Sequence, residues 1–307
     1  MLINKLAREY AATHYFVRET QKTFLQIVDL FVRRAKIQRF NELDLEAIIQ
    51  FKDDTLRVAQ PVSFNGYLRY LRLLGDYAVA GGYLDKNLFR SIKTANPGRK
   101  LFRVLEKETI RKALDILEHT DEYPNEAVFW VCVIKTLYYT GMRRRQLTSL
   151  NVGDVDLKRD TIILSYRGSK THREWAIPIH PDLKPVMVEH LDRVRVRLGR
   201  PLKPSDPVFN KDVFPSQYRG DPNRPGALLP TTISDFFKRF KKKTGVHLSS
   251  HRFRHTFATN LCNPVEGEPD VLAVQELLGH TMLQTTKEYV HIRTDRMAKI
   301  LRGLNMD

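Results

Sequence analysis

The chain has 307 residues, of which 42% are hydrophobic and 28% charged, and its formal net charge at pH 7 is +16. A chain of this length can form two domains with separate cores, and its composition excludes a disordered or fibrous protein. The excess of positive charge indicates a polyanionic partner, most simply a nucleic acid, and both the first hundred residues and the remainder contribute to it.

The first hundred residues predict a small, basic helical domain. Apolar residues at helical spacing follow Thr20, Asn41 and Ser63, and the last of these helices ends near Gly81. The basic side chains on these helices are either solvated or, as a group, able to contact phosphates: Arg18, Lys22, Arg33, Arg34, Arg69 and Arg72.

A polar segment at residues 96–100 contains Pro97 and Gly98, which interrupt any helix. We therefore predict a helical domain at 1–95, a linker at 96–100 and a second domain at 101–307.

The second domain predicts helices with one small β-hairpin. Apolar spacing indicates helices at 106–119, 126–139, from Arg143 onward, 181–198, around 233–240, and at 251–261, 270–278, 283–292 and 295–303. Two strand-like runs, 161–166 and 174–179, flank a polar turn and predict the hairpin. Residues 201–230 are rich in proline and predict an irregular loop. The fold class expected is mainly α with a small β-hairpin or sheet.

Two cysteines, Cys132 and Cys262, do not make a disulfide framework or a metal-type spacing, and this fits a reducing cytosol. No run approaches about 18 apolar residues, so we expect no membrane span and a cytoplasmic location.

Four polar clusters stand apart from this helical background. They are Thr140-Gly-Met-Arg-Arg-Arg-Gln146, Lys170 in the hairpin turn, His251-Arg-Phe-Arg-His255, and His280 with Tyr289. Taken singly, each has an ordinary explanation: solvated arginines, a structural histidine, a tyrosine packed in a helix. Their combination and order carry the functional prediction.

The four clusters resemble the sequence boxes of the tyrosine recombinases, which include the phage integrases and the Xer-type resolvases. Arg143 resembles the first arginine, Lys170 the hairpin lysine, and His251-x-x-Arg254 the second box. Leu277-Leu-Gly-His280 followed by Tyr289 resembles the last box and its nucleophile. The resemblance covers the second domain box by box. The first domain agrees only in being small, helical and basic.

Two positions depart from the family pattern. The family usually has a carboxylate three residues after the first arginine, and this chain has Gln146. An amide accepts a hydrogen bond but holds a guanidinium less firmly than an ion pair does. The segment from Cys262 to Pro269 is also slightly longer than usual. Within the arginine triplet, Arg143 follows the Thr-Gly-apolar signature and is chosen over Arg144 and Arg145.

The resemblance implies a two-domain C-shaped clamp around duplex DNA and a chemical role for each residue. Tyr289 would attack the phosphate, giving a 3′-phosphotyrosine intermediate and, after strand exchange, a Holliday junction. The implied roles are phosphate binding for Arg143, Arg254 and His280, proton acceptance or phenol orientation for His251, and protonation of the leaving 5′-oxygen for Lys170. The scheme needs no metal or cofactor, and His255 is interpreted as structural.

The resemblance also implies partners. These are double-stranded DNA with inverted-repeat core sites and three further copies of the chain, as a dimer per site and a homotetramer on paired sites. Met297, Ile300, Leu301 and Leu304 form an apolar face that would dock on a neighbouring subunit. The target sequence and the host element are not readable from the chain, nor is the choice among integration, excision and resolution. The members of the basic run 238–243 that contact DNA are equally open.

Two other functions stay open. A type IB topoisomerase uses the same tyrosine chemistry on a single duplex. A DNA-binding regulator could keep the fold without catalysis, although the complete set of boxes argues against it.

Overall fold

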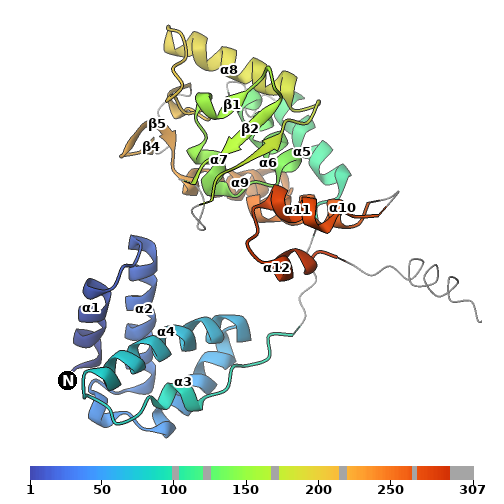
Figure 1. Cartoon of the computed structure of the whole chain (residues 1–307). Coiled ribbons are helices and arrows are strands. Elements are labelled where there is room, and N and C mark those ends of the chain that lie inside the picture. Colours follow the sequence, from blue (N-terminus) through green and yellow to red (C-terminus); the bar gives the residue numbers. More distant parts are fainter. Residues whose placement is uncertain (99–103, 120–125, 167–172, 214–219, 265–267, 291–307) are drawn as a thin grey trace, which may run out of the picture. The chain divides into compact units, whose positions relative to one another are not determined.

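The computed structural model describes residues 1–98, 104–119, 126–166, 173–213, 220–264 and 268–290. The chain forms two compact units, residues 1–101 and 102–307 (Figure 1). Across the described ranges, no helix has both the length and the apolar character that crossing a membrane requires.

The first unit is a helical bundle. Its helices are α1 (Ile3–Thr13), α2 (Arg18–Ala35), α3 (Leu45–Val58) and α4 (Pro61–Ala80), with the 3-10 turns η1 (Phe40–Glu42) and η2 (Leu88–Ser91). Each α-helix buries an apolar stripe, and the core contains several fully enclosed phenylalanines: Phe24, Phe31, Phe51, Phe64 and Phe89. Burial of such stripes, rather than helix propensity, supplies most of the stability of short helices.

The three helices predicted for this unit are confirmed, with changes at their starts. Asp44 rather than Asn41 caps α3, because its Oδ1 accepts the backbone N–H of Ala47 at 2.8 Å. Pro61 occupies the first turn of α4, two residues before the predicted start at Ser63. The helix α1 is additional to the predicted set.

Some of the basic side chains proposed for phosphate contacts donate hydrogen bonds within this unit. The guanidinium of Arg72 donates to the carbonyl of Ile92 at 2.6 Å, and that of Arg34 donates to Thr55 Oγ1 at 3.0 Å. These two guanidiniums therefore connect segments of this unit: Arg34 links α2 to α3, and Arg72 links α4 to the segment after η2. Arg69 remains on the surface, with its guanidinium over an aromatic ring.

The second unit surrounds one apolar helix. The helices are α5 (Lys107–His119), α6 (Ala127–Thr140), α7 (Arg144–Ser149), α8 (Lys184–Leu198), α9 (Pro230–Thr244), α10 (Ser250–Cys262), α11 (Val271–Leu278) and α12 (Leu283–Lys287), with 3-10 turns η3 (Val152–Asp154) and η5 (Lys211–Val213). Helix α6 contacts α5, α8 and α10, and it is buried on nearly all sides. The helix predicted at 126–139 is therefore confirmed, and it forms the centre of this unit.

A small antiparallel sheet lies on this unit, in the order β1-β2-β3. Its strands are β1 (Val155–Asp156), β2 (Thr161–Leu164) and β3 (Trp175–Pro178), and Ile162 pairs with Ile177. The predicted hairpin is therefore confirmed and gains a short edge strand. The fold class, mainly α with a small sheet, is also confirmed.

The proline-rich segment 201–230 is more regular than predicted. Within its described part, β4 (Gly220–Asp221) pairs with β5 (Arg224–Leu228), which runs into α9. Arg224 donates to the carbonyls of Thr148 and Ser149 at 2.9 and 3.2 Å, so this hairpin is tied to the end of α7. Composition alone did not show this tertiary contact.

Candidate active site

The first arginine box lies where α6 ends and α7 begins. Gly141 ends α6 with a φ of 58°, which favours glycine. A Cβ atom at this position would lie 2.4 Å from Phe257 Cδ1, so glycine also permits the close approach of α10. The chain then turns through Met142 and presents Arg143 as the residue that precedes α7.

Arg143 has a half-buried side chain with a buried nitrogen, Nη1, that has no hydrogen-bond partner. Burial lowers the pKa of this arginine. Gln146 does not hold the guanidinium: its Oε1 accepts the backbone N–H of Arg143 at 2.8 Å. The amide at this position therefore fixes the backbone of the box and leaves the guanidinium directed elsewhere. A buried donor without an acceptor is costly in a folded protein unless a ligand supplies the acceptor.

Arg254 lies on the buried face of α10, where only 6% of the residue is exposed. Its Nη1 donates to the carbonyl of Gly141 at 2.9 Å, and its Nη2 donates to the carbonyl of Leu278 at 2.8 Å. Burial and the neighbouring charge of Arg143 lower the pKa of Arg254 to about 9. The group therefore stays charged at neutral pH, and it links the ends of α6 and α11.

His280 follows the end of α11 and is held at both ring nitrogens. Nη2 of Arg254 lies 2.9 Å from its Nε2, and Oγ1 of Thr286 lies 2.9 Å from its Nδ1. An arginine can only donate, so Nε2 accepts and Nδ1 carries the proton. Burial, Arg254 and Arg143 together lower the pKa of His280 to about 4, and the ring is neutral at pH 7.

Tyr289 lies in the turn after α12 and is 5% exposed. Its ring lies near two imidazoles, with centroids 6.3 Å from His280 and 5.5 Å from His255. Burial raises the pKa of the phenol, while the charges of Arg254 and Arg143 act in the opposite direction. The hydroxyl is therefore protonated at neutral pH and close to two cationic groups.

His251 is exposed in the first turn of α10, one turn before His255, and the two ring centroids are 6.5 Å apart. Burial lowers the pKa of His255, with smaller contributions from His251 and Arg254. The His255 ring lies against Tyr289, with centroids 5.5 Å apart, and its interpretation as structural stays a prediction. Arg252 connects the start of α10 to the segment before α5, since its Nη2 donates to the carbonyl of Val104 at 3.1 Å.

Lys170 falls outside the described residues, but the strand that follows it is well anchored. Arg173 pairs with Glu276 of α11 at 2.9 Å. The indole Nε1 of Trp175 donates to the carbonyl of Leu277 at 3.2 Å. The base of the hairpin is therefore fixed to α11, immediately before His280.

Gly279 makes this packing possible. A Cβ at this position would meet the Trp175 ring at 2.3 Å, and the residue has a φ of 60°. The segment 297–304, with the apolar face expected to dock on a neighbour, also falls outside the described residues.

The other arginines of the first box face different surroundings. Arg144 donates to Ser234 Oγ of α9, and Arg145 is exposed. The charges of Arg143 and Arg254 lower the pKa of Tyr289, which supports the choice of Arg143 from the arginine triplet.

The structure brings Arg143, Arg254, His280 and Tyr289 close together. His251 lies on the same helix as Arg254, about one turn before it. Sequence reasoning missed Thr286, which is fully buried against His280, and the Arg173–Glu276 pair. The Thr285-Thr286 dipeptide was visible in the sequence, but its contact with His280 depends on the turn between α11 and α12.

Comparison with known sequences gives a consistent result. The sequence model of the phage integrase family matches residues 103–296. The putative tyrosine recombinase XerC of Pseudomonas syringae is 26% identical over 313 residues, which cover 98% of this chain and 64% of that protein. The tyrosine recombinase XerC of Proteus mirabilis is 27% identical over 288 residues, covering 92% of this chain and 85% of the relative. The chain thus spans somewhat less than two thirds of the length of the Pseudomonas syringae relative.

Solved structures share the fold at low sequence identity. The Tn1549 transposon integrase in complex with a circular intermediate DNA superposes with a TM-score of 0.75 at 17% identity, covering 99% of this chain and 100% of the other. The lambda integrase of a tetramer bound to a Holliday junction gives a TM-score of 0.70 at 18% identity, covering 100% and 80%.

Proposed function

Because this chain belongs to the phage integrase family, we propose that it is a site-specific DNA recombinase that cleaves and rejoins strands through a covalent bond to Tyr289. Its substrate is double-stranded DNA with inverted-repeat core sites. The relatives named as tyrosine recombinases support the reaction class. The arrangement of Arg143, Arg254 and Tyr289 supports the residue roles.

One observation carries the proposal: the unpartnered buried nitrogen of Arg143 beside a second buried arginine. Arg143 Nη1 has no acceptor within the described protein. The charge of Arg143 lowers the pKa of Arg254, and the charges of both arginines lower the pKa of His280, so the two guanidiniums lie close together. Two adjacent guanidiniums repel unless an anion lies between them. A phosphodiester supplies that anion and gains charge as the phosphorus is attacked, so such donors stabilise the transition state by roughly 3 kcal/mol each.

The proposed first step transfers a phosphoryl group to tyrosine. The Tyr289 oxygen forms a bond to phosphorus, and the bond from phosphorus to the 5′-oxygen breaks. The phenolic proton passes to His251, directly or through His255, and Lys170 protonates the departing 5′-oxygen. The reverse step, with a 5′-hydroxyl from a second duplex, joins new partners without loss of bond energy. Tyr289 is 5% exposed as a whole residue, and the proposal requires its hydroxyl to reach the phosphate when DNA binds.

His280 has a modified role in this scheme. Its Nε2 accepts from Arg254 in the free protein, so the ring orients that arginine instead of offering a proton to the phosphate. We propose that this is its function before DNA binds. A rearrangement that releases Nε2 and moves the proton to it would be needed for the donor role suggested by the sequence boxes.

Assembly is the remaining part of the proposal. Strand exchange between two duplexes needs two sites. A dimer binds each site, so four protomers take part. The Holliday junction is the intermediate after the first pair of strands has been exchanged and before the second pair is exchanged. The lambda integrase tetramer bound to a Holliday junction supports this by its shared fold alone. The helical unit 1–95 would bind the core site next to the catalytic domain, and residues 295–303 would dock on a neighbouring protomer.

A suicide substrate tests the function. A duplex with a nick close to the cleavage site loses a short 5′-hydroxyl fragment after attack, so the covalent complex accumulates. Candidate sites flanking the gene are incubated with the wild-type protein and with Tyr289→Phe. The wild type should form an adduct, and Y289F should bind the same DNA without forming one. Joining of two differently labelled duplexes separates a recombinase from a topoisomerase, which would relax supercoiled DNA without exchange.

A further inference from the structure

Thr286 lies next to both His280 and the proposed nucleophile. Its Oγ1 is 2.9 Å from His280 Nδ1, and its backbone carbonyl accepts the N–H of Tyr289 at 3.0 Å. The residue belongs to the short helix α12 and is fully buried. Its neighbour in the same helix, Thr285, is exposed. The hydroxyl of Thr286 is therefore placed to act on the imidazole that contacts Arg254.

The main chain of His280 is fixed by one residue of the preceding helix. The N–H of His280 donates to the carbonyl of Gln275 at 3.0 Å, and the carbonyl of His280 accepts the side-chain amide of Gln275 at 3.0 Å. Gly279, with a φ of 60°, turns the chain between the two. Because this backbone is held in place, the ring can respond to a ligand by moving its proton while staying where it is.

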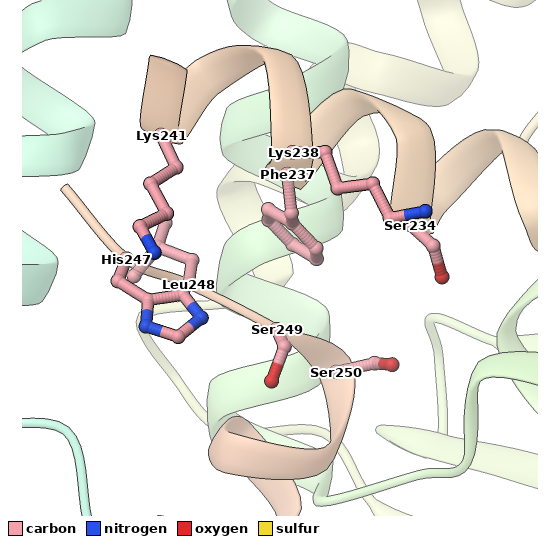
Figure 2. A pocket seen from close by; sticks show the side chains of 8 residues that line it. All are labelled: Ser234, Phe237, Lys238, Lys241, His247, Leu248, Ser249 and Ser250. Atoms are coloured by element: carbon pink, nitrogen blue, oxygen red, sulfur yellow. The ribbon is translucent and has the colours of Figure 1, made fainter. Parts of the chain in front are cut away.

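Arg254 is also held in place. It lies in the second turn of α10, and the hydroxyl of Ser249 caps this helix by accepting a backbone N–H of the first turn at 3.2 Å. Figure 2 shows the capped start beside Phe237 of α9, which lines the same small hollow as Ser249. Both hydrogens of Arg254 Nη2 are engaged, one with the carbonyl of Leu278 and one with His280 Nε2.

This arrangement leaves the free site with one hydrogen-bond donor too many. An arginine can only donate, so His280 Nε2 accepts and its Nδ1–H donates to the oxygen of Thr286. The hydroxyl hydrogen of Thr286 then lacks an acceptor, since His280 is the hydrogen-bond partner found for this side chain among the residues that the structure describes. A buried donor without an acceptor is unfavourable. A ligand that accepts hydrogen bonds would relieve it.

A phosphate oxygen changes this count. When it accepts the Nη2–H of Arg254, Nε2 of His280 no longer faces a donor and can carry the ring proton itself. Nε2–H then donates to the phosphate, and the hydroxyl of Thr286 donates to the lone pair that is left on Nδ1. Every donor that these three groups had shared now has an acceptor. The unpartnered Nη1 of Arg143 adds a further donor for the same anion.

We propose that Thr286 is a positioning residue that holds His280 in its Nε2–H tautomer when DNA binds. The inference rests on the proposed function, because the phosphate is that of the DNA strand to be cleaved. The ring has one proton before and after the change: Nδ1 releases a proton to water, and Nε2 takes one from water. Thr286 acts through the imidazole and does not itself contact the phosphate.

Two substitutions separate the hydroxyl from the shape of the side chain. Thr286→Val keeps the branched shape without the hydroxyl, and Thr286→Ser keeps the hydroxyl. T286V should form the covalent adduct about tenfold more slowly in single turnovers at saturating core-site duplex, with unchanged DNA affinity. T286S should stay within about threefold of the wild type, and so should T285V, the matched control. Equal losses in T286V and T286S would overturn the role of the hydroxyl.

A double-mutant cycle identifies the group through which Thr286 acts. His280→Asn removes the imidazole, so adding T286V to H280N should not slow adduct formation further. A further tenfold loss in the double variant would show that Thr286 acts independently of His280, for example through its contact with the Tyr289 N–H, and would overturn the proposal.

The tautomer itself is measured by NMR of the imidazole nitrogens in protein labelled with ¹⁵N-histidine. The signals of His280 are those lost in H280N. The free protein should carry the proton on Nδ1, and the uncleaved complex of Y289F with core-site duplex should carry it on Nε2. A proton that remains on Nδ1 in the complex, or protons on both nitrogens, would contradict the role of Thr286.

Failure of the proposed function gives a different result. In that case the wild-type protein forms no adduct on any candidate site. An active wild type with an equally active T286V contradicts the role of Thr286 and leaves the proposed function intact.

Discussion

Arg254 donates a hydrogen bond to His280 Nε2 at 2.9 Å, and this contact determines the tautomer of the histidine and helps to orient the guanidinium. The histidine must be a neutral acceptor, with its proton on Nδ1 toward Thr286. The arginine is held by that ring and by the carbonyls of Gly141 and Leu278, so its guanidinium is already oriented when DNA arrives. Orientation before the reaction is what makes such donors effective in a transition state.

Replacing Arg254 by lysine tests this orientation. A lysine keeps the charge but lacks the planar fork that reaches Gly141, Leu278 and His280 together. We expect R254K to form the covalent adduct about a hundredfold to a thousandfold more slowly, with DNA binding reduced far less. Single-turnover adduct formation at saturating DNA gives the rate. A rate within threefold of the wild type would show that charge alone is sufficient.

Gly141 and Gly199 provide a matched pair for the contact between α6 and α10. Both have a left-handed φ, 58° and 63°, but a Cβ at 141 meets Phe257 at 2.4 Å whereas nothing lies within 4 Å at 199. G199A should lose about 1 kcal/mol of unfolding free energy from backbone strain. G141A should lose about 3 kcal/mol, because overpacking adds to the strain. Urea denaturation measures both, and equal losses would contradict the close packing.

The pair Arg173–Glu276 tests whether α11 positions the hairpin that bears Lys170. Both side chains are substantially exposed, so the pair should contribute less than about 1 kcal/mol to stability. We expect Glu276→Arg to slow cleavage while the melting temperature changes by only a few degrees. The double variant Arg173→Glu with Glu276→Arg should recover most of the rate. Failure of the double variant to recover would show that the ion pair does not position the hairpin.

Stability should fall between pH 6.5 and pH 4 because of two buried histidines. The pKa values of His190 and His280 are both lowered to about 4, chiefly by burial. The unfolded chain binds protons from about pH 6.5 downward, and the folded chain does not until about pH 4. The unfolded state therefore binds more protons in this window, and unfolding free energy rises with pH by up to about 1.4 kcal/mol per pH unit for each histidine.

His190→Gln isolates one of these contributions. Glutamine can still donate to the carbonyl of Val208, which His190 Nε2 contacts at 2.8 Å. H190Q should flatten the dependence of unfolding free energy on pH by about one proton between pH 4 and 6.5. H119Q, at an exposed position on α5, is the control for the loss of a histidine. The same slope in H190Q as in the wild type would contradict a neutral buried ring.

Local patterns in the sequence were sufficient to predict most of the second domain. The apolar spacing of α6 and α9 and the alternation of β2 and β3 are strong signals over short windows. The sequence boxes then identified Arg143, Arg254, His280 and Tyr289, which the structure brings together. Their catalytic roles stay predictions, and so do Lys170 and the oligomeric state.

Contacts between distant segments could not be predicted. Arg254 donates to the carbonyl of Gly141, 113 residues earlier, and no local pattern encodes that pairing. The tautomer of His280 depends on Thr286, and the burial of Tyr289 depends on packing against α10 and α11. Arg72 looked like a surface residue on its helix, yet a distant carbonyl captures it. Each of these depends on tertiary structure and not on residue type.

The identity of the nucleophile is tested most directly by mapping the covalent adduct. The suicide complex is digested with protease and nuclease, and the peptide that carries the nucleotide is sequenced by mass spectrometry. A 3′-phosphotyrosine at Tyr289, absent from Y289F, is the predicted result. An adduct at another tyrosine, or an adduct that persists in Y289F, would contradict the assignment of Tyr289.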